Sequence, residues 1–312
     1  MNRRVFNRLC AAALLPAAAR TAHGAGYPWN LGIITDQVDL DLARVLSAFY
    51  PKYHLRWAEI RSLKLWGAER YVYTGATADQ LKQTRRQLDD AGVRVSVLDT
   101  AVYKIALPGT VPVGDSPAYA NPEGNDFARQ LEDLKRAAGA AHALGSERVR
   151  IFTFRRVANP ELIFDRIVEQ LHQALAVARQ QDITLLVENE YDCNTATAAE
   201  TARLFRAIPD RRLMHNWDPC NAYEMGEQPF PKAWDQLDHS RISHIHLKDA
   251  TGSAWRPIGA GELDFRGQFR ALRQMNYSGT LSVETRYKNA RQDLYASSVE
   301  SMNGLLKILN RL

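Results

Sequence analysis

The chain lacks an apolar run long enough to cross a bilayer as a helix, and it has only three cysteines among its 312 residues. The first absence excludes a membrane span, and the second excludes a fold held together by many disulfides. Cys10 lies in the N-terminal segment, so Cys193 and Cys220 are the cysteines of the main body. From sequence these two could form a disulfide in an oxidising compartment or remain free thiols.

The N-terminal segment differs from the rest of the chain. Residues 1–25 have a basic start, a short Ala/Leu stretch and small residues before Tyr27, which is the layout of a cleaved export signal. Arg3 and Arg4 stand shortly before Phe6, as in a twin-arginine signal. We therefore expect export to the periplasm by that route, with a general secretory signal or an uncleaved anchor as alternatives. Residues 26–312 are expected to form one domain.

Acidic and basic residues nearly balance once the signal is set aside. The formal net charge is +5, and residues 1–25 carry four arginines and no acid, which leaves about +1 for the remainder. The basic residues are interleaved with acids along the chain rather than clustered. This balance argues against nucleic acid as a partner.

The chain also lacks a Gly-rich phosphate-binding turn after its first strand-like run, LGIITDQVD, which disfavours a doubly wound open sheet. Short runs rich in Val, Ile, Leu and aromatic residues alternate with helical periodicity from Leu31 onward. Eight such strands, each followed by a helix, predict an α/β fold of the (β/α)8 TIM barrel type. The predicted strands are 31–35, 54–60, 93–99, 148–154, 184–190, 213–218, 242–248 and 280–285.

Helices are predicted over 126–143, 161–179 and roughly 290–311. Thr77 and Asn159 have the side chains of helix starts, and Gly92 and Gly145 stand where helix C-caps are expected. No internal repeat or low-complexity linker interrupts the pattern. The Pro/Gly-rich segment 103–124 follows the third strand, so we expect it to be a long loop on the catalytic face.

Four residues with chelating side chains end four consecutive predicted strands. Glu188 ends LLVE, Asp218 ends HNWD, His246 ends ISHIH and Glu284 ends LSVE. Acids and imidazoles are costly to bury beside aliphatic strands unless something compensates for them. The strand ends of a parallel barrel meet at one face, so these four side chains are expected to converge there. Three carboxylates and one imidazole predict one divalent ion, Mn²⁺, Mg²⁺ or Co²⁺, with Zn²⁺ also tolerated.

These segments resemble the xylose isomerase-like barrel superfamily, which includes sugar phosphate isomerases/epimerases. The resemblance covers roughly Leu31 to Leu312 and is most specific at HIHLKD (244–249) and GAGELDF (259–265), with LVEN, WDPCN and SVET agreeing in order and spacing. It implies the same four metal ligands. It also implies that Glu188 and Glu284 exchange a proton beside a carbonyl of a small carbohydrate, through a metal-stabilised enediolate. An oligomer is compatible with this reading.

Further polar residues near the strand ends are candidates for binding the substrate. They are Lys248, Asn221, Glu190, Arg155, Arg286 and Glu59. Lys248 follows His246 by two residues and so shares its side of the strand. Asn221 stands where several members of the family carry a His. Candidates for stacking on a sugar ring are Trp57, Trp66, Trp217 and Trp255.

Three other functions remain to be weighed. An endonuclease of this superfamily needs extra histidines, but Glu59 and Asp99 end strands two and three and no Asp-x-His pair follows His246, which excludes a three-metal site. A lyase or dehydratase acting on keto-sugars or keto-glycosides could use the same metal site. A non-catalytic periplasmic sugar-binding barrel is the third hypothesis. Since an exported protein seldom meets sugar phosphates, we expect an unphosphorylated sugar, polyol or glycoside.

Overall fold

The computed structural model describes residues 29–65, 67–113 and 126–312. The predicted export signal, Trp66 and residues 114–124 of the predicted loop lie outside the described residues.

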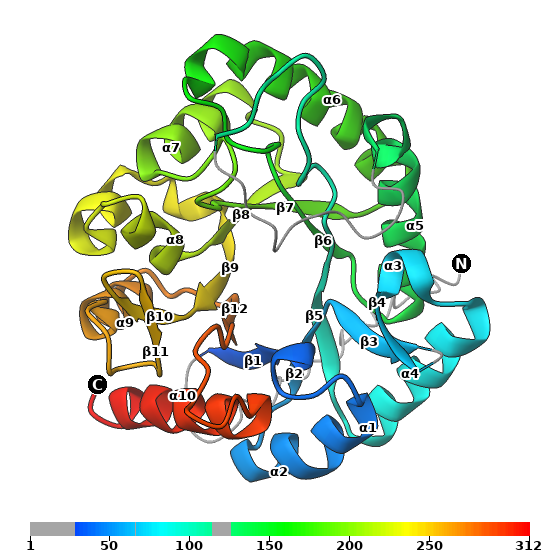
Figure 1. Ribbon diagram of the computed structural model, residues 1–312, viewed down its shortest axis with the longest axis vertical. Coiled ribbons are helices and arrows are strands. Elements are labelled where there is room, and N and C mark those ends of the chain that lie inside the picture. The colour runs from blue at the N-terminus through cyan, green and yellow to red at the C-terminus, as the bar shows by residue number, and fades with distance from the viewer. Residues whose placement is uncertain (1–28, 66, 114–125) are drawn as a thin grey trace, which may run out of the picture.

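Eight parallel strands close into a barrel with helices around it (Figure 1). The strands follow one another around the barrel in the order β1-β12-β9-β8-β7-β6-β5-β2. Their bounds are β1 Asn30–Ile34, β2 Trp57–Ile60, β5 Arg94–Asp99, β6 Arg148–Ile151, β7 Thr184–Glu188, β8 Leu213–Trp217, β9 Ile242–Leu247 and β12 Thr280–Val283. The predicted (β/α)8 barrel is confirmed, and the closed ring excludes the open doubly wound sheet.

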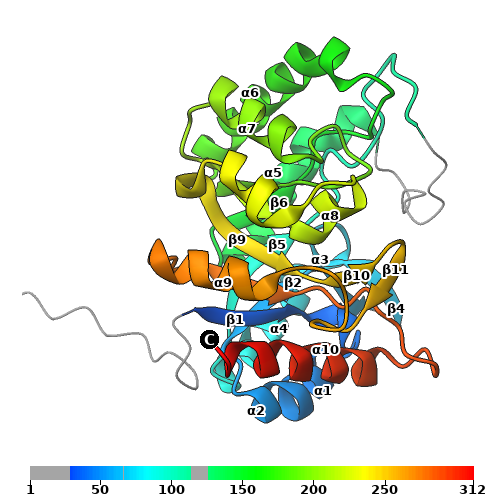
Figure 2. The same ribbon diagram turned by 90° about the vertical axis from the view of Figure 1, so that its left-hand side faces the viewer.

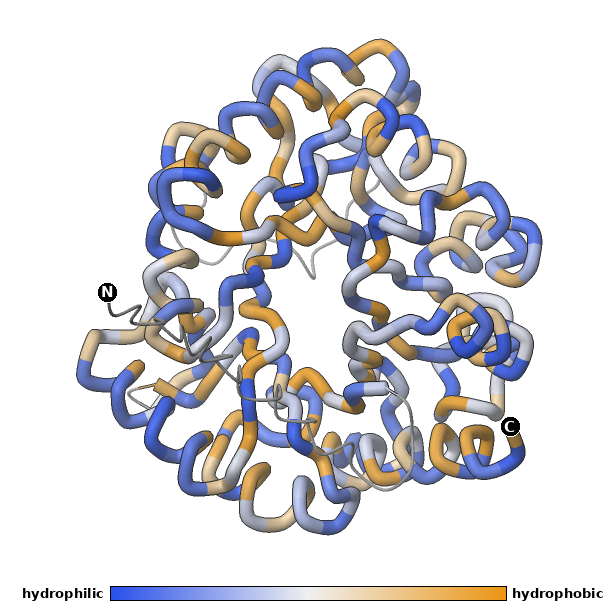
Figure 3. Tube along the Cα trace, turned by 180° about the vertical axis from the view of Figure 1, so that it is seen from behind, coloured by the Kyte–Doolittle hydropathy of each residue, from blue (hydrophilic) through white to orange (hydrophobic). Residues whose placement is uncertain are grey.

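The strands form where hydrophobic residues run almost without interruption, because both faces of a parallel barrel strand are covered. All four residues of β12, and the last four of β7, are buried. Figure 3 shows hydrophobic residues recurring along the ring of strands, with hydrophilic residues frequent on the outer helices.

The helices carry the start and stop signals of the sequence. The Thr77 side chain forms a capping box with Gln80 at the start of α4, and the side chain of Asn159 accepts from Glu161 N before the helical turn Pro160–Ile163. Gly92 and Gly145 have φ of 63° and 79°, the left-handed conformation of a helix C-cap. The helices are α1 Leu42–Arg44, α2 Tyr50–Tyr53, α3 Val72–Gly75, α4 Ala78–Asp90, α5 Gln130–Ala143, α6 Phe164–Gln180, α7 Ala198–Ala207, α8 Pro219–Glu224, α9 Phe265–Gln274 and α10 Leu294–Leu309. Short 3-10 or π-helical segments cover Thr35–Gln37, Val45–Phe49, Phe127–Arg129, Pro160–Ile163, Pro229–Ala233, Trp234–Gln236 and His239–Arg241.

Two antiparallel hairpins, which the sequence pattern did not predict, extend the barrel beyond β2 and β9. They pair β3 (Ser62–Leu65) with β4 (Ala68–Tyr71), and β10 (Asp249–Thr251) with β11 (Ala254–Arg256). Figure 2 shows the β10–β11 hairpin projecting past the barrel strands. The Asp249 carboxylate accepts hydrogen bonds from the backbone N–H groups of Gly259 and Gly261, so this acid fastens the loop after the hairpin.

Cys193 and Cys220 are both buried free thiols. Of the two alternatives left open by the sequence, the structure therefore has the free thiols. Among the described residues, no helix has the length and apolar character needed to cross a membrane.

Candidate metal centre

The four chelating residues converge at the C-terminal ends of their strands. Glu188, Asp218, His246 and Glu284 each present one ligand atom, and these atoms all lie within 4.8 Å of one another. His246 Nδ1 is 3.1 Å from Glu188 Oε1, 3.6 Å from Asp218 Oδ2 and 3.8 Å from Glu284 Oε2. None of the four residues is more than 5% exposed.

Strand register explains this convergence. Glu188 on β7 pairs with Asn216 on β8, and His246 on β9 pairs with Ser282 on β12. Asp218 follows Asn216 by two residues, and Glu284 follows Ser282 by two residues. Because side chains two residues apart point to the same side of a strand, both acids lie on the same face, closer to the C-terminal end of the barrel. Residues separated by almost one hundred positions in the sequence are thereby brought to one face of the barrel.

The two carboxylate oxygens of Asp218 have different partners: one caps a helix and the other faces the site. Oδ1 accepts from the backbone N–H groups of Cys220 and Asn221 and caps α8. Oδ2 is buried and lies 2.8 Å from Lys248 Nζ and 3.6 Å from His246 Nδ1. The helix cap fixes the carboxylate so that Oδ2 faces the centre of the site.

Cationic side chains hold the carboxylates in place. Lys248 Nζ is 2.8 Å from both Asp218 Oδ2 and Glu284 Oε2. Arg150 Nη1 is 3.0 Å from Glu188 Oε2, and Arg61 Nη1 is 3.6 Å from Glu284 Oε1. Each glutamate therefore has one oxygen beside an arginine and the other directed toward His246.

These contacts set the protonation of the site. Burial alone would raise the pKa of Glu188, but His246 and Arg150 outweigh it and hold the pKa well below its usual value. Burial is likewise outweighed at Glu284, where Lys248 and Arg286 hold the pKa well below its usual value. Both carboxyls are thus ionised at neutral pH. For His246 burial acts to lower the pKa, yet Glu59 and Glu188 raise it well above its usual value.

The donor set fits a divalent cation. Carboxylate oxygens and one imidazole nitrogen are the ligands of Mn²⁺, Mg²⁺, Co²⁺ and Zn²⁺. Acidic side chains also crowd the His246 ring, whose nitrogens have oxygens of Glu59, Glu188, Asp218 and Glu284 within 3.8 Å. A divalent ion bound among these carboxylates would face oxygens of the kind it prefers as ligands.

The predicted substrate-shell residues line the same face, but most are engaged with acids. Asn221 Nδ2 donates to Asn189 O at 2.8 Å and lies 3.3 Å from Glu188 Oε1, so it steadies a predicted ligand. Glu190 is buried against Lys104 Nζ at 2.7 Å, which ties it to the loop after β5.

The remaining substrate-binding candidates are also paired with acidic side chains or histidines. Arg155 pairs with Asp192 at 2.5 Å. Arg286 lies 3.9 Å from Glu284 Oε1. The Glu59 carboxylate is wholly buried between two histidines of β9.

Of the tryptophans proposed to stack on a sugar ring, only one of those described is placed to do so near the four ligands. Trp217 is fully buried, so it packs in the core and cannot stack on a ligand. Trp57 begins β2 in register with Arg94, which begins β5, and this places it at the end of the barrel away from the four ligands. Trp255, on the β10–β11 hairpin, lies at the metal face, with Lys248 Nζ 5.6 Å from its ring centroid.

Sequence reasoning missed Arg150, Arg61, Lys104 and His244. Arg150 and His244 were detectable, because each alternates with hydrophobic residues inside a strand, at RVRI and ISHIH, where an inward charge needs a partner. Arg61 and Lys104 lie in loops just past β2 and β5, and nothing in their local pattern indicates a direction.

The Xylose isomerase-like TIM barrel family matches residues 58–305. The chain belongs to this family. None of the curated protein sequences compared with the chain matches it. Similar solved structures share the fold at low identity. The IolI protein with a bound zinc atom is 14% identical, has a TM-score of 0.68, and the alignment covers 90% of this chain and 98% of that one.

Two further structures of this xylose isomerase-like fold belong to proteins with different chemistry. The probable 3-DHS dehydratase AsbF from Bacillus anthracis is 15% identical, with a TM-score of 0.65 and coverage of 89% of this chain and 98% of that one. The 3-keto-D-glucoside 4-epimerase YcjR from E. coli is also 15% identical, with a TM-score of 0.62 and coverage of 88% and 99%. The fold is therefore compatible with both epimerisation and dehydration.

Proposed function

We propose that the protein is a divalent-metal-dependent sugar isomerase or epimerase that moves a proton at a carbon next to a carbonyl. One observation carries the proposal: the ligand atoms of Glu188, Asp218, His246 and Glu284 converge within 4.8 Å at the C-terminal face of the barrel. This is the face on which barrel enzymes bind and convert their substrates. The epimerase and the zinc-bound protein of the same fold add support.

The roles of the side chains follow from their contacts. The four ligands would hold the cation, which when bound would polarise the substrate carbonyl and offset the charge that develops on its oxygen. Glu188 and Glu284 are held ionised by their cationic neighbours and can each accept or return the proton. Lys248, beside Glu284 and under Trp255, can donate a hydrogen bond to a sugar hydroxyl or carbonyl oxygen.

A lyase or dehydratase acting on keto-sugars or keto-glycosides is the second candidate. The same proton abstraction ends in elimination if a leaving group on the next carbon departs before the proton returns. Asn221 favours keeping this candidate, because it is held by Asn189 O and Glu188 where several sugar epimerases of the family carry a His. The dehydratase of the same fold points in the same direction.

Mass spectrometry in D₂O separates the two reactions. The purified protein with Mn²⁺ is incubated with a panel of keto-sugars and 3-keto-glycosides. An isomerase or epimerase yields a product of unchanged composition carrying one solvent deuterium. A lyase releases water or the aglycone, so mass loss in place of deuterium uptake would contradict the first proposal and support the second.

A binding protein without activity is tested with Glu284→Gln. If the protein is an enzyme, this variant loses deuterium exchange but still binds the sugar, because the amide keeps the shape of the carboxylate without its basicity. A binding protein would show no exchange in either form, and its affinity for the sugar would persist after removal of the metal with EDTA.

We also propose that the chain is exported to the periplasm through its N-terminal signal and acts there on an unphosphorylated sugar, polyol or glycoside. Cell fractionation of a tagged chain, with Arg3 and Arg4 both changed to Lys, tests the route. Retention of the unprocessed variant in the cytoplasm is expected, and periplasmic delivery of the variant would contradict twin-arginine export.

A further inference from the structure

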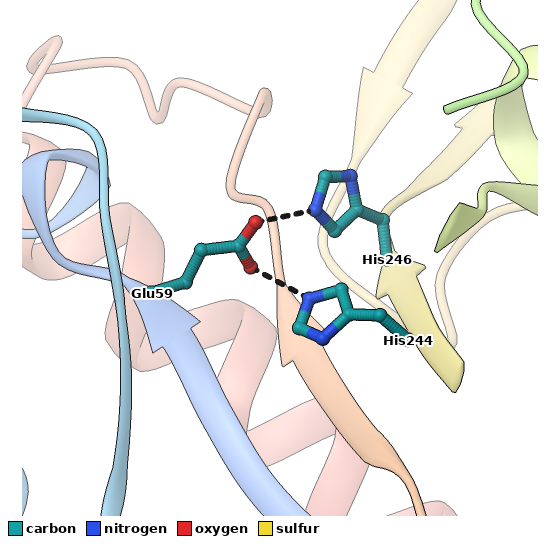
Figure 4. Close-up of side chains that lie close together, drawn as sticks. All are labelled: Glu59, His244 and His246. Carbon is teal, nitrogen blue, oxygen red and sulfur yellow. Dashed lines mark hydrogen bonds and ion pairs between the residues drawn. The ribbon is translucent and has the colours of Figure 1, made fainter. Parts of the chain in front are cut away.

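The Glu59 carboxylate bridges two imidazole rings inside the barrel (Figure 4). Oε1 is 2.8 Å from His246 Nε2, and Oε2 is 2.9 Å from His244 Nε2. All three side chains are fully buried. Because β12 and β1 lie between β9 and β2 in the barrel order, Glu59 reaches the histidines across the interior rather than from a neighbouring strand.

This contact determines which nitrogen of His246 faces the predicted ligands. A carboxylate only accepts hydrogen bonds, so both Nε2 atoms must carry protons. His246 Nδ1 then points toward the three carboxylates, 3.1 Å from Glu188 Oε1. By the same rule Nδ1 also carries a proton toward Glu188 while no metal is bound. A divalent cation would take the place of that proton, and the ring left protonated at Nε2 offers its lone pair at Nδ1.

Asn216 is a second neighbour of the same ring nitrogen. Its Nδ2 lies 3.1 Å from His246 Nε2, where two donors would face each other, while its Oδ1 has no hydrogen-bond partner among the described residues. With the two amide atoms exchanged, the amide oxygen would accept from Nε2–H. The Glu59 carboxylate, which can only accept, is what places the proton on Nε2.

We propose that Glu59 is a positioning residue, which holds the proton of His246 on Nε2 so that Nδ1 binds the divalent cation. Glu59 thus acts behind His246 and does not touch the substrate, in contrast to the role expected from its place at the end of strand two. The inference rests on the proposed metal site but not on which reaction that site carries out.

A competing arrangement uses the same atoms. Glu59, His244 and His246 each present a ligand atom within the same 4.8 Å limit, so they too could surround a cation. Such an ion would take Nε2 of both rings and displace both hydrogen bonds to Glu59. The observed separations of 2.8 and 2.9 Å are those of hydrogen bonds, which favours the positioning role.

Metal titration of the full protein tests the proposal. Wild type and Glu59→Gln are stripped with EDTA and titrated with Mn²⁺ by calorimetry, with free Mn²⁺ followed by electron paramagnetic resonance. The glutamine oxygen accepts from one ring, but its NH₂ opposes the N–H of the other. Loss of such a partner weakens metal binding roughly 10- to 100-fold, and we expect this loss at an unchanged stoichiometry of one. Glu59→Asp should recover part of the affinity, and the exposed Glu132→Gln should bind as wild type does.

Nitrogen NMR of the Zn²⁺-loaded protein labelled with ¹⁵N-histidine gives a second readout that general destabilisation would not move. In wild type we expect His246 Nε2 to carry a hydrogen-bonded proton and Nδ1 to show the shift of a metal-bound nitrogen. In Glu59→Gln the Nε2–H signal should move or broaden. A metal-bound Nε2 in wild type would overturn the proposal even if the variant did not fold.

The outcomes separate the proposals from one another. A wild type that binds no ion refutes the metal site itself. If wild type and Glu59→Gln bind one ion equally well with the same nitrogen signals, only the role of Glu59 is refuted. Two ions in wild type and one in the variant would make Glu59 a ligand of a second cation.

Discussion

Replacing Lys248 by Met tests whether this lysine neutralises the carboxylates of the site when no metal is bound. The ammonium lies 2.8 Å from Asp218 Oδ2 and 2.8 Å from Glu284 Oε2, and the lysine is only 4% exposed. It therefore neutralises two of the carboxylates that would bind the cation. Lys248→Met keeps the aliphatic stem but leaves these acids facing each other.

The size of the effect follows from these distances. With an effective dielectric constant of about 20, each contact is worth roughly 6 kcal/mol before desolvation is counted. Desolvation of the ions offsets much of this, and removing one partner of a buried pair costs about 3–5 kcal/mol. The metal-free variant should therefore melt roughly 6–10 °C below wild type. If a bound cation restores about 2 kcal/mol of the loss, the variant binds the metal roughly 30-fold more tightly.

Differential scanning calorimetry with EDTA or Mn²⁺, combined with Mn²⁺ titration, measures both effects. Lys135→Met is the matched control, because Lys135 is 47% exposed and pairs with Glu132 at 3.6 Å on a helix surface. We expect the control to match wild type within about 0.5 kcal/mol. A Lys248→Met variant that binds metal no better than wild type would refute the competition between lysine and cation.

Three further predictions concern the surroundings of the site. Arg150→Met should lower the free energy of unfolding by about 3–5 kcal/mol in urea denaturation, since it leaves Glu188 without its buried partner, and an unchanged midpoint would contradict this role. Burial raises the pKa of Glu224 to about 7 despite Lys248, so the folded protein holds a proton that the unfolded chain releases near 4.5. The stability that this group contributes is complete below about pH 4.5 and is lost as the pH rises through 7. The melting temperature of Glu224→Gln should therefore equal that of wild type at about pH 4.5 and exceed it at about pH 8. Burial raises the pKa of both Cys193 and Cys220, so in the chain from residue 26 onward Ellman's reagent should detect no thiol in the native protein and two in urea.

The barrel could be predicted from sequence because its strands are local and hydrophobic. Runs such as TLLVE and TLSV are buried on both faces, and a parallel strand of that kind needs no information from distant residues. The caps at Thr77 and Gly92 depend on single residues in the same way. The four chelating residues were found because their chemistry conflicts with their apolar strands.

The charge partners of the site could not be predicted with the same ease. Arg61 reaches Glu284 across the barrel mouth from a loop that follows β2, and Lys104 reaches Glu190 from another loop. These pairings depend on loop conformation, which has no periodic signal. The β10–β11 hairpin was missed because its strands have only three residues each, too short for a pattern of alternation.

The central claim is that four strand-end side chains form one divalent metal site. A crystal of the protein grown with Mn²⁺ and measured near the manganese absorption edge tests it most directly. The account predicts a single anomalous peak within about 2.0–2.3 Å of ligand atoms from Glu188, Asp218, His246 and Glu284, with the nitrogen contributed by His246 Nδ1. The absence of a peak there, or a peak bound to other residues, would contradict it.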